Sequence, residues 1–464
     1  MLTRLLLPLL AALVASAAST SAAAAPPDLP LAEKITVGGF EIDLAAPPAG
    51  LVVRKDLGLV AAAALDGQVV HRAAEGKHIY ETRAIRTPGG DYLLMFPEGQ
   101  HYASGGGGKK INDLVAFRSS DGGKTWQGPT VPFAIDYSQH GFIPLVPRGS
   151  KRIYAFGTQP IPGKWAWNKG EKENAPIGFR WSDDDGRTWS DVTLIEPAND
   201  PGFKGMSVMR MAETESGTWI LGSHEADWAV KPLTTRQYLL RSEDKGKTWT
   251  ALPAARPNGW FVPAFNRMDE GRPIALGGPR VLAMIRTPEG HLWAARSDDD
   301  GRTWTAPAPT PLIHPDAPPM LFHLSDGKTL VAFHHNRHSQ TTYTGLTGKM
   351  EGQKDRSEIW ASTSTDEGRT WTEPRLVFAN AAAPNLANSW YNYQCSYMDM
   401  FADAGTLHLF LPHRWERALH LTLPESALAT LPTKADLAAG GAKAAKPVAT
   451  STALPPGGKP DKKK

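Results

Sequence analysis

Seven of the 14 histidines fall near the predicted ends of strands, where they could transfer protons or bind a metal ion. They are His101, His140, His224, His314, His334, His335 and His413. Imidazole titrates near neutral pH and is a common metal ligand, so imidazoles that converge with carboxylates could act as acid and base or hold a cation. Scattered histidines more often hydrogen-bond a ligand or the backbone. We therefore predict ligand-binding roles for His140 and His335, and we expect no metal ion and no cofactor.

A second group of polar residues recurs in a fixed pattern, Ser-x-Asp-x-Gly-x-Thr-Trp. Five copies begin at Ser119, Ser182, Ser242, Ser297 and Ser364, with spacings of 63, 60, 55 and 67 residues. The Asp can accept hydrogen bonds from the N–H groups of a turn, the Gly can adopt a positive φ, and the Trp can anchor the turn in apolar surroundings. We interpret the motif as a structural turn and do not assign catalysis to its aspartates, such as Asp121, Asp184 and Asp366.

The elements that position these residues are predicted to be β-sheets. A β-rich run precedes each copy of the motif, so the motif joins the last two strands of a unit of roughly 60 residues. Such a unit suits one four-stranded sheet, and radial repetition of these sheets produces a β-propeller. A sixth unit without the motif is predicted over residues 392–423, and residues 35–65 are predicted to supply the strand that closes the ring.

Composition agrees with an all-β chain and narrows its partners. The 464 residues include 44 Gly, 39 Pro and 15 Trp, and the single Cys395 excludes an intramolecular disulfide and a cysteine zinc site. The net charge is +3, but the tail from Lys434 carries +5 and Arg4 carries +1, which leaves about −3 for the remaining body. We therefore expect no nucleic-acid partner, because such a protein normally presents a basic stripe.

The two ends of the chain differ from its body. Residues 1–25 combine a basic start, an apolar run and small residues, which predicts a secretory signal peptide. A membrane anchor is the alternative, and Pro8 disfavours it. We expect residues 26–431 to form the propeller and residues 432–464 to be a disordered tail rich in Ala, Pro and Lys. The mature protein is therefore predicted to be secreted or periplasmic, without stable membrane insertion.

The five motifs resemble the Asp-box, or BNR repeat, of the sialidase superfamily. The resemblance covers residues 75–425 and implies an all-β, six-bladed β-propeller of sialidase type with five Asp-box turns. It also implies a glycan substrate and a site with three arginines, a tyrosine nucleophile polarised by a glutamate, and an aspartate acid/base. Planar guanidinium groups suit the binding of a substrate carboxylate. A tyrosine nucleophile is a known departure from the usual pair of carboxylates in glycosidases.

Three residues match the pattern of the superfamily by position. Arg83 opens the inner strand of the first unit, Arg337 ends a strand after a Gly turn, and Tyr397 begins the sixth unit. Arg280 is the first choice for the third arginine and Arg210 the second. The alternative for Arg337 is a surface arginine paired with a carboxylate, and the alternative for Tyr397 is a tyrosine buried in a strand.

The chain departs from the superfamily where the acid/base is expected. The loop that ends the first unit's second strand holds no aspartate before the next strand, so Glu98 or His101 would have to transfer the proton. Glu225 or Asp316 would have to polarise Tyr397. We therefore predict an exported exo-glycosidase that removes terminal sialic acid or a related acidic sugar. The open alternatives are a glycosidase or lyase for another acidic polysaccharide, and a non-catalytic carbohydrate-binding propeller.

Overall fold

The computed structural model describes residues 29–99, 112–133, 135, 141–158, 174–227, 229–230, 233–264, 266–337, 355–384 and 394–445. Within these ranges the regular elements are strands, apart from one 3-10 helix (Glu425–Thr430) and one α-helix, α1 (Lys434–Ala439). The all-β prediction is thus confirmed. None of the helices in the described ranges is long and apolar enough to span a membrane. The predicted signal peptide, residues 1–25, lies outside the described residues.

The described strands form seven sheets, of which six contain four or more strands. The first of these six holds β6 (His78–Ile79), β7 (Arg83–Arg86), β8 (Tyr92–Gly99), β9 (Asn112–Ser119) and β10 (Gln127–Thr130). The second holds β11 (Ile143–Leu145), β12 (Ile153–Thr158), β13 (Ile177–Ser182) and β14 (Thr193–Leu194). The third holds β15 (Ser207–Glu213), β16 (Trp219–Asp227), β17 (Thr234–Ser242) and β18 (Thr250–Leu252). The fourth sheet holds β19 (Asp269–Gly277), β20 (Arg280–Arg286), β21 (His291–Ser297) and β22 (Ala308–Ile313).

The fifth and sixth sheets combine strands from distant parts of the chain. The fifth holds β23 (Met320–His323), β24 (Leu330–His334), β25 (Glu358–Ser364), β26 (Arg375–Asn380), β4 (Leu59–Ala62) and β3 (Leu51–Arg54), and the sixth holds β27 (Asp399–Asp403), β28 (Thr406–His413), β29 (Arg417–Pro424) and β5 (Asp66–Arg72). The seventh sheet is small and holds β1 (Lys34–Val37), β2 (Phe40–Asp43) and β30 (Lys443–Ala444). The predicted unit without the motif forms β27, β28 and β29.

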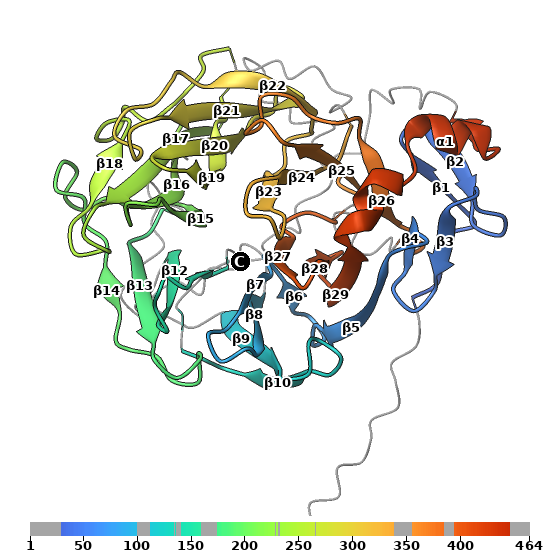
Figure 1. Cartoon of the computed structure of the whole chain (residues 1–464), viewed down its shortest axis with the longest axis horizontal. Coiled ribbons are helices and arrows are strands. Elements are labelled where there is room, and N and C mark those ends of the chain that lie inside the picture. The colour runs from blue at the N-terminus through green and yellow to red at the C-terminus, as the bar shows by residue number, and fades with distance from the viewer. Residues whose placement is uncertain are drawn as a thin grey trace, which may run out of the picture.

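The six larger sheets are arranged around a common centre (Figure 1). Strands β7, β11, β15, β19, β23 and β27 contact one another in turn, and β27 contacts β7. Each is at or near the start of its sheet in chain order. Residues at the starts of these strands therefore meet in the middle of the molecule although they are far apart in sequence.

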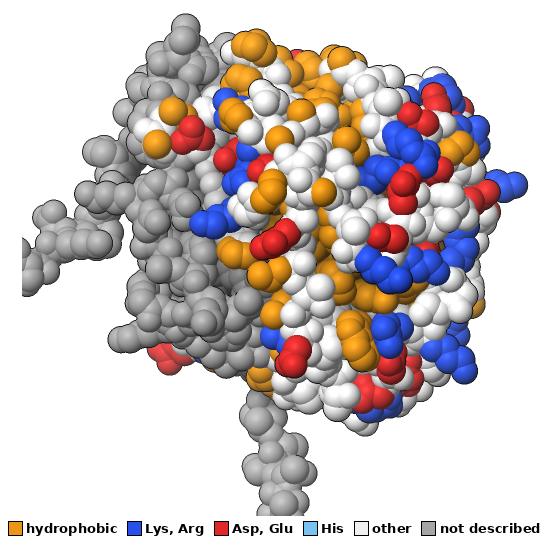
Figure 2. All heavy atoms as spheres, turned by 90° about the vertical axis from the view of Figure 1, so that its left-hand side faces the viewer, with side chains coloured by type: hydrophobic (Ala, Val, Ile, Leu, Met, Phe, Trp, Pro, Cys, Tyr) orange, Lys and Arg blue, Asp and Glu red, His pale blue; other side chains and the backbone are white. Residues whose placement is uncertain are grey.

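Apolar side chains fill the spaces between neighbouring sheets. One buried cluster joins the fifth and sixth sheets through residues such as Phe333, Val377 and Leu409. Another joins the second and third sheets through residues such as Phe156 and Trp219. Burial of apolar surface between like sheets therefore holds each sheet beside the next. On the outer side that carries β14 and β18, the described acidic and basic side chains are interspersed (Figure 2).

The closing strand differs from the predicted one. The strand that completes the sixth sheet is β5, residues 66–72, which pairs with β29 in antiparallel register. Within the predicted segment 35–65, β4 instead pairs with β26 of the fifth sheet. Both pairings cover a sheet edge that would otherwise be open, which is the physical reason for adding N-terminal strands there.

The five repeated motifs form turns, as their residue types predict, and these turns join β9 to β10, β13 to β14, β17 to β18, β21 to β22 and β25 to β26. In the turn after β25, Asp366 Oδ1 accepts hydrogen bonds from the backbone N of Thr370 (2.8 Å) and of Arg369 (3.1 Å), and Ser364 Oγ accepts one from Gly368 N (2.8 Å). Gly368 has a φ of 77°. Trp371 packs against the apolar cluster of the fourth and fifth sheets. Equivalent Asp contacts recur at Asp121, Asp184, Asp244 and Asp299.

The predicted disordered tail begins too early. Thr433 and Asp436 form a reciprocal capping box at the start of α1, and β30 pairs with β2. Leu437 is fully buried against the apolar cluster that includes Trp360. Two anchors, a capped helix and a buried Leu, therefore order residues 432–445 despite their Ala-rich composition. Residues 446–464 lie outside the described residues.

Candidate active site

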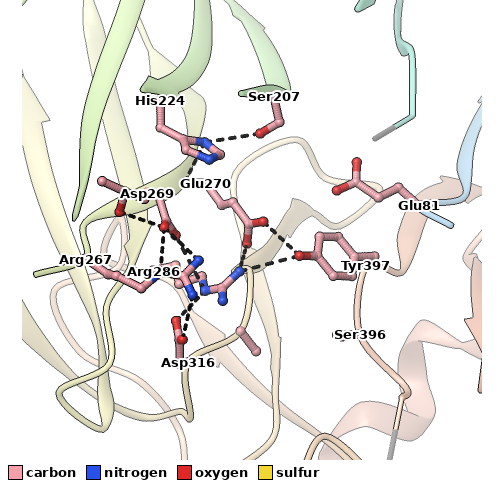
Figure 3. Close-up of polar contacts among 12 residues, drawn as sticks. Glu81, Ser207, His224, Arg267, Asp269, Glu270, Arg286, Asp316, Ser396 and Tyr397 are labelled. Carbon is pink, nitrogen blue, oxygen red and sulfur yellow. Dashed lines mark hydrogen bonds and ion pairs between the residues drawn. The ribbon is translucent and has the colours of Figure 1, made fainter. Parts of the chain in front are cut away.

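Tyr397 lies beside a carboxylate and a guanidinium group at the centre of the ring (Figure 3). Its Oη donates a hydrogen bond to Glu270 Oε1 at 2.8 Å. Arg286 Nη1 donates to Glu270 Oε2 at 2.5 Å and lies 3.4 Å from the Tyr397 Oη. Glu270 is the second residue of β19, Arg286 is the last residue of β20, and Tyr397 comes two residues before β27. The antiparallel hairpin β19–β20 and the segment that leads into β27 of the sixth sheet therefore bring all three groups together.

Tyr397 and Glu270 share an uncommon backbone conformation. Their φ angles are 63° and 50°, in the left-handed region that residues other than glycine seldom adopt. Such a conformation costs of order 1–3 kcal/mol and persists only where the surrounding structure imposes it. The phenol and the carboxylate that it contacts are therefore aimed at each other by the packing of two separate sheets.

Arg286 belongs to a buried network of alternating charges. Its Nε donates to Asp316 Oδ1 at 2.5 Å and lies 3.5 Å from Asp269 Oδ1. Arg267 bridges the same two carboxylates, at 3.0 Å to Asp269 and 3.1 Å to Asp316. Burial by itself would lower the pKa of Arg286, but the carboxylates of Asp316, Glu270 and Asp269 outweigh it and raise the pKa well above its ordinary value. Asp316 thus holds Arg286 in place. The prediction that Asp316 polarises Tyr397 is wrong, because the described contacts of its carboxylate are with Arg286 and Arg267.

A second guanidinium group lies on another side of the phenol. Arg356 Nη2 donates to the backbone O of Asp316 at 2.6 Å, and Nη1 donates to Ser396 Oγ at 3.3 Å. Its Cζ is 5.9 Å from the centroid of the Tyr397 ring. Burial and the nearby positive charge of Arg286 lower the pKa of Arg356. A negatively charged ligand would offset both effects.

Arg83, which the sequence predicted for this site, contacts the backbone at Tyr397. Its Nη1 donates to the carbonyl O of Thr82 (2.9 Å) and of Tyr397 (3.5 Å), and its Nη2 donates to Glu81 Oε2 (2.5 Å). Glu81 also accepts a hydrogen bond from Gly141 N at 3.0 Å and faces the site from the side opposite Glu270 (Figure 3). The structure therefore brings Arg83 and Tyr397 together and adds a buried carboxylate, Glu81, beside them.

Apolar side chains surround the Tyr397 ring. Tyr80, Met209 and Trp415 form one buried cluster with it, and only 8% of Tyr397 is exposed. Burial, with the charge of Glu270, raises the pKa of the Tyr397 phenol well above its ordinary value, although Arg286 and Arg356 oppose this rise. The phenol is therefore neutral at neutral pH, and the nearest group that can take its proton is Glu270.

Arg280 lies at the wrong end of its strand for this site. It opens β20, next to the hairpin from β19, whereas Arg286 closes the same strand. Its side chain is 46% exposed and forms an ion pair with Glu367 at 3.0 Å. Glu367 belongs to the repeated turn after β25. The prediction of Arg280 as the third arginine of the site is therefore wrong, because Arg280 is a surface arginine paired with a carboxylate.

Arg337 also lies apart from the cluster around Tyr397. It donates to Glu358 Oε1 at 2.9 Å and to the carboxylate of Asp355, and reaches the backbone O of Thr36 at 3.4 Å. These partners belong to the fifth sheet and to the small N-terminal sheet. The guanidinium groups beside Tyr397 are instead Arg286 and Arg356, together with the predicted Arg83. Arg210, the second choice for the third arginine, donates to Asp399 Oδ1 at 3.3 Å, below the site.

Glu98 has structural partners. Its Oε2 contacts His71 Nε2 at 2.9 Å, and its Oε1 accepts a hydrogen bond from Ala74 N at 2.9 Å. Burial by itself would raise the pKa of Glu98, but the hydrogen bonds from His71 and Ala74 outweigh it and lower the pKa. A lowered pKa is the wrong direction for an acid that must carry a proton at neutral pH.

Two more predicted residues lie in other surroundings. Glu225 pairs across β16 and β17 with Arg236 in the third sheet, and burial raises its pKa. None of the described contacts joins Glu225 to Tyr397. His335 stacks on His314 and donates to the backbone O of Glu358 at 2.8 Å, and burial lowers its pKa to about 3. His335 is therefore a neutral, packed imidazole. His101 and His140 lie outside the described residues, so their roles stay predictions.

Sequence reasoning missed Glu270, Arg286 and Arg356. The sequence does place Asp269-Glu270 at the start of one predicted strand and Arg286 at the end of the next, and antiparallel strands bring such residues together. This antiparallel pairing was the signal in the sequence that could have identified Glu270 and Arg286. Among the described residues, no group of three or more His, Cys, Asp or Glu side chains is arranged to hold a metal ion.

Comparison with known proteins adds the family. Residues 142–409 match the BNR repeat-like domain family. A xyloglucanase from Paenibacillus sp is 26% identical over 211 residues, which are 43% of this chain and 19% of that protein. A sialidase from Bacteroides fragilis is 28% identical over 214 residues, which are 42% of this chain and 37% of that protein. The aligned part of the chain thus spans less than two fifths of either relative.

Solved structures share the fold at low sequence identity. A protein of unknown function from Dyadobacter fermentans has a TM-score of 0.54 at 16% identity and covers 78% of this chain and 99% of its own. The Hadza microbial sialidase Hz136 has a TM-score of 0.53 at 18% identity, covering 78% and 69%. The NanB sialidase from Streptococcus pneumoniae has a TM-score of 0.54 at 12% identity, covering 79% and 71%. The chain therefore belongs to the BNR repeat-like domain family and is a divergent member of the sialidase superfamily.

Proposed function

We propose that this protein is an exported glycoside hydrolase with a six-bladed β-propeller fold that removes a terminal acidic sugar, such as sialic acid, from glycans. The six sheets around one centre support the propeller, and the sequence of residues 1–25 supports export. The observation that carries the enzymatic proposal is the contact of Tyr397 with Glu270 and Arg286. A sialidase and a xyloglucanase among the relatives support glycan hydrolysis.

In the proposed first step, the Tyr397 Oη attacks the anomeric carbon and passes its proton to Glu270. A bond forms between Oη and the sugar while the glycosidic C–O bond breaks, and the departing oxygen takes a proton from a separate acid. A neutral phenol suits this role, because a carboxylate nucleophile would be repelled by the carboxylate of the sugar. Water then attacks the same carbon, the Oη–sugar bond breaks, and Tyr397 recovers its proton.

The charge of the site selects the substrate class. Arg286 and Arg356 flank the phenol, and Arg83 contacts its backbone. Guanidinium groups bind a carboxylate through charge-assisted, often bidentate hydrogen bonds. The described hydrogen bonds of Arg356 go to neutral oxygens, so a neutral xyloglucan would leave this buried cation without a carboxylate partner. We therefore favour an acidic sugar despite the xyloglucanase relative.

The acid that protonates the departing oxygen is assigned separately from the nucleophile. Glu98 carries a lowered pKa and structural hydrogen bonds, so we do not retain it. Glu81 is a described carboxylate that faces the site beside Arg83, and it replaces Glu98 as our candidate alongside His101. Substrates with a good leaving group need no such acid, so their turnover should survive Glu81→Gln better than that of natural glycans.

A fluorogenic sialoside tests the proposal directly. Tyr397→Phe keeps the ring and removes the nucleophile, so kcat should fall by at least about 10³-fold. Tyr238→Phe is the matched control, because Tyr238 is also fully buried but its Oη only accepts a hydrogen bond from Gly259 N. Unchanged turnover in Tyr397→Phe would remove the nucleophile assignment. Absence of turnover in the wild type would remove sialic acid as substrate.

The same residues also suit a second reaction, β-elimination from a polysaccharide that contains a uronic acid. The arginines would neutralise the carboxylate, and Tyr397 would remove the adjacent carbon-bound proton. The departure of the first-unit loop from the superfamily, which lacks the expected aspartate, motivates this alternative. Products that absorb in the near ultraviolet would indicate elimination, whereas saturated products would indicate hydrolysis.

A further inference from the structure

A second group of arginines comes from the central strands β15 and β19, and its member on β19 lies two residues beyond Glu270. Arg272 pairs with Met284 on β20, two residues further along the strand from Arg286, which is about 7 Å at the usual rise of a strand. Only 1% of Arg272 is exposed. Its Nε and Nη2 have no hydrogen-bond partner in the described part of the chain. A buried guanidinium with unpaired N–H groups is strongly destabilising unless something accepts from them.

Arg272 shares its surroundings with Arg210. The two guanidinium carbons lie 6.0 Å and 4.9 Å from the centroid of the same ring, Phe322. Arg210, Arg272 and Phe322 come from β15, β19 and β23, which are successive strands of the central circuit. Two cationic side chains from neighbouring sheets therefore converge on one apolar wall.

The carboxylates nearby are already used. Asp399 accepts from Arg210 through Oδ1 at 3.3 Å and from Ala84 N through Oδ2 at 3.0 Å. Glu81 is paired with Arg83. These groups comprise three cations, Arg83, Arg210 and Arg272, against two anions, so the described cluster lacks one negative charge.

The lowered pKa of Arg272 agrees with this excess of positive charge. Burial, and then the positive charge of Arg83, lower the pKa of Arg272 to about 9, and Arg210 adds to the decrease. Asp399 and Glu81 raise it only in part. An anion bound beside Arg272 would restore its pKa and satisfy its free N–H groups.

We propose that a small monovalent anion of halide size binds between Arg272 and Arg210, on the neighbouring central strands β19 and β15. The N–H groups of Arg272 donate to it, the guanidinium of Arg210 adds charge, and the Phe322 ring forms the apolar wall. A halide fits the near-complete burial of Arg272 better than a larger oxyanion does. This site is distinct from the proposed carboxylate site, which is formed by Arg286 and Arg356 beside the phenol.

Crystals grown without halide and soaked in sodium bromide test the site in the unaltered protein. An anomalous peak within hydrogen-bond distance of Arg272 Nε or Nη2 is the expected result. Bromide found only at the surface would indicate an adventitious ion only, and this result would overturn the proposal. A second soak adds N-acetylneuraminic acid. Loss of the central peak in that soak would show that the anion position is the sugar carboxylate position, and would overturn the claim of a distinct site.

Thermal stability provides an independent measurement in solution. At constant ionic strength, replacing gluconate by chloride should raise Tm saturably, by about 2–4 °C, in the wild type. Arg280→Met should show the same rise, because Arg280 is exposed and paired with Glu367 on the surface. Arg272→Met should show none, and Arg272→Lys, which keeps the charge, should retain part of it. Equal chloride effects in the wild type and Arg272→Met would overturn the site.

Discussion

In the fourth sheet, a repeated turn and part of the candidate site occupy opposite ends of the same strands. Asp269 pairs with Arg286 at one end, whereas Val281 pairs with Ser297, the first residue of the turn, at the other. In the turn, Asp299 binds Thr303, four residues away. At the site, Glu270 binds Tyr397, 127 residues away. Local contacts thus form the turns, whereas contacts between residues of different sheets form the site.

The two ends also differ in exposure and in repetition. Of the turn aspartates, Asp121 is exposed and the other four are half-buried, and the same contacts occur in five copies. The site residues are buried, occur once each, and include two residues with a positive φ. Repetition therefore marks the turn that five of the six larger sheets share, and the departures from repetition mark the residues available for chemistry.

The largest expected effect separates the two ends by activity. Glu270→Gln removes the proton acceptor of Tyr397 and should lower kcat by about 10²–10³-fold, because general base catalysis contributes this much. Glu225→Gln is the matched control, since Glu225 lies in the third sheet, and its kcat should stay within about twofold of wild type. Steady-state kinetics with the fluorogenic sialoside checks both. Equal losses in the two variants would break the comparison.

The next effect concerns two arginines that flank strands of the fifth sheet, Arg337 after β24 and Arg356 before β25. Arg356→Lys loses the planar fork beside the phenol and should raise KM for an acidic glycoside by about 10–100-fold. Arg337→Lys, with its partners Glu358 and Asp355 away from the phenol, should change KM less than about threefold. The ratio of the two KM values is the measurement. A larger effect at Arg337 would support the sequence-based assignment over the structural one.

A turn substitution should affect stability without affecting chemistry. Gly301 has a φ of 74°, and a Cβ there would lie 2.5 Å from Ile220 Cδ1. Gly301→Ala should therefore lower the free energy of unfolding by about 1–2 kcal/mol or more, measured in urea, with kcat unchanged. Gly327→Ala, with a φ of 65° and no atom within 4 Å, isolates the backbone cost. A fall in kcat of folded Gly301→Ala would show that the turns and the site are coupled.

The smallest effect is a pH dependence near the first turn. His420 contacts His408 at 2.9 Å and Gly123 O at 3.2 Å, and burial, with the nearby His408, lowers the pKa of His420 to about 4. An unfolded imidazole titrates near 6.5, so the unfolded state takes up a proton first as the pH falls. This stability is complete above about pH 6.5 and is lost toward pH 4, with roughly 1 kcal/mol lost between pH 7.5 and 5.5.

Chemical denaturation of the wild type and His420→Gln across that pH range measures the contribution. The wild type should lose stability more steeply than the variant on the acid side, because only the wild type keeps this buried imidazole neutral. Parallel curves would show that His420 does not set the pH dependence.

Tyr397 and Arg83 became candidates only through the resemblance of the chain to the sialidase superfamily. The sequence by itself determined the repeated turns and the sheets that follow from them. Those features depend on local hydrogen bonding, glycine geometry and short-range strand pairing, which the residue order encodes directly. It did not determine the partners of Tyr397, and it placed Arg280 and Arg337 where Arg286 and Arg356 belong. Only the tertiary structure decided which residues contact Tyr397. The packing of the six sheets around one centre sets which strand ends meet, and burial decides how the charges there are paired.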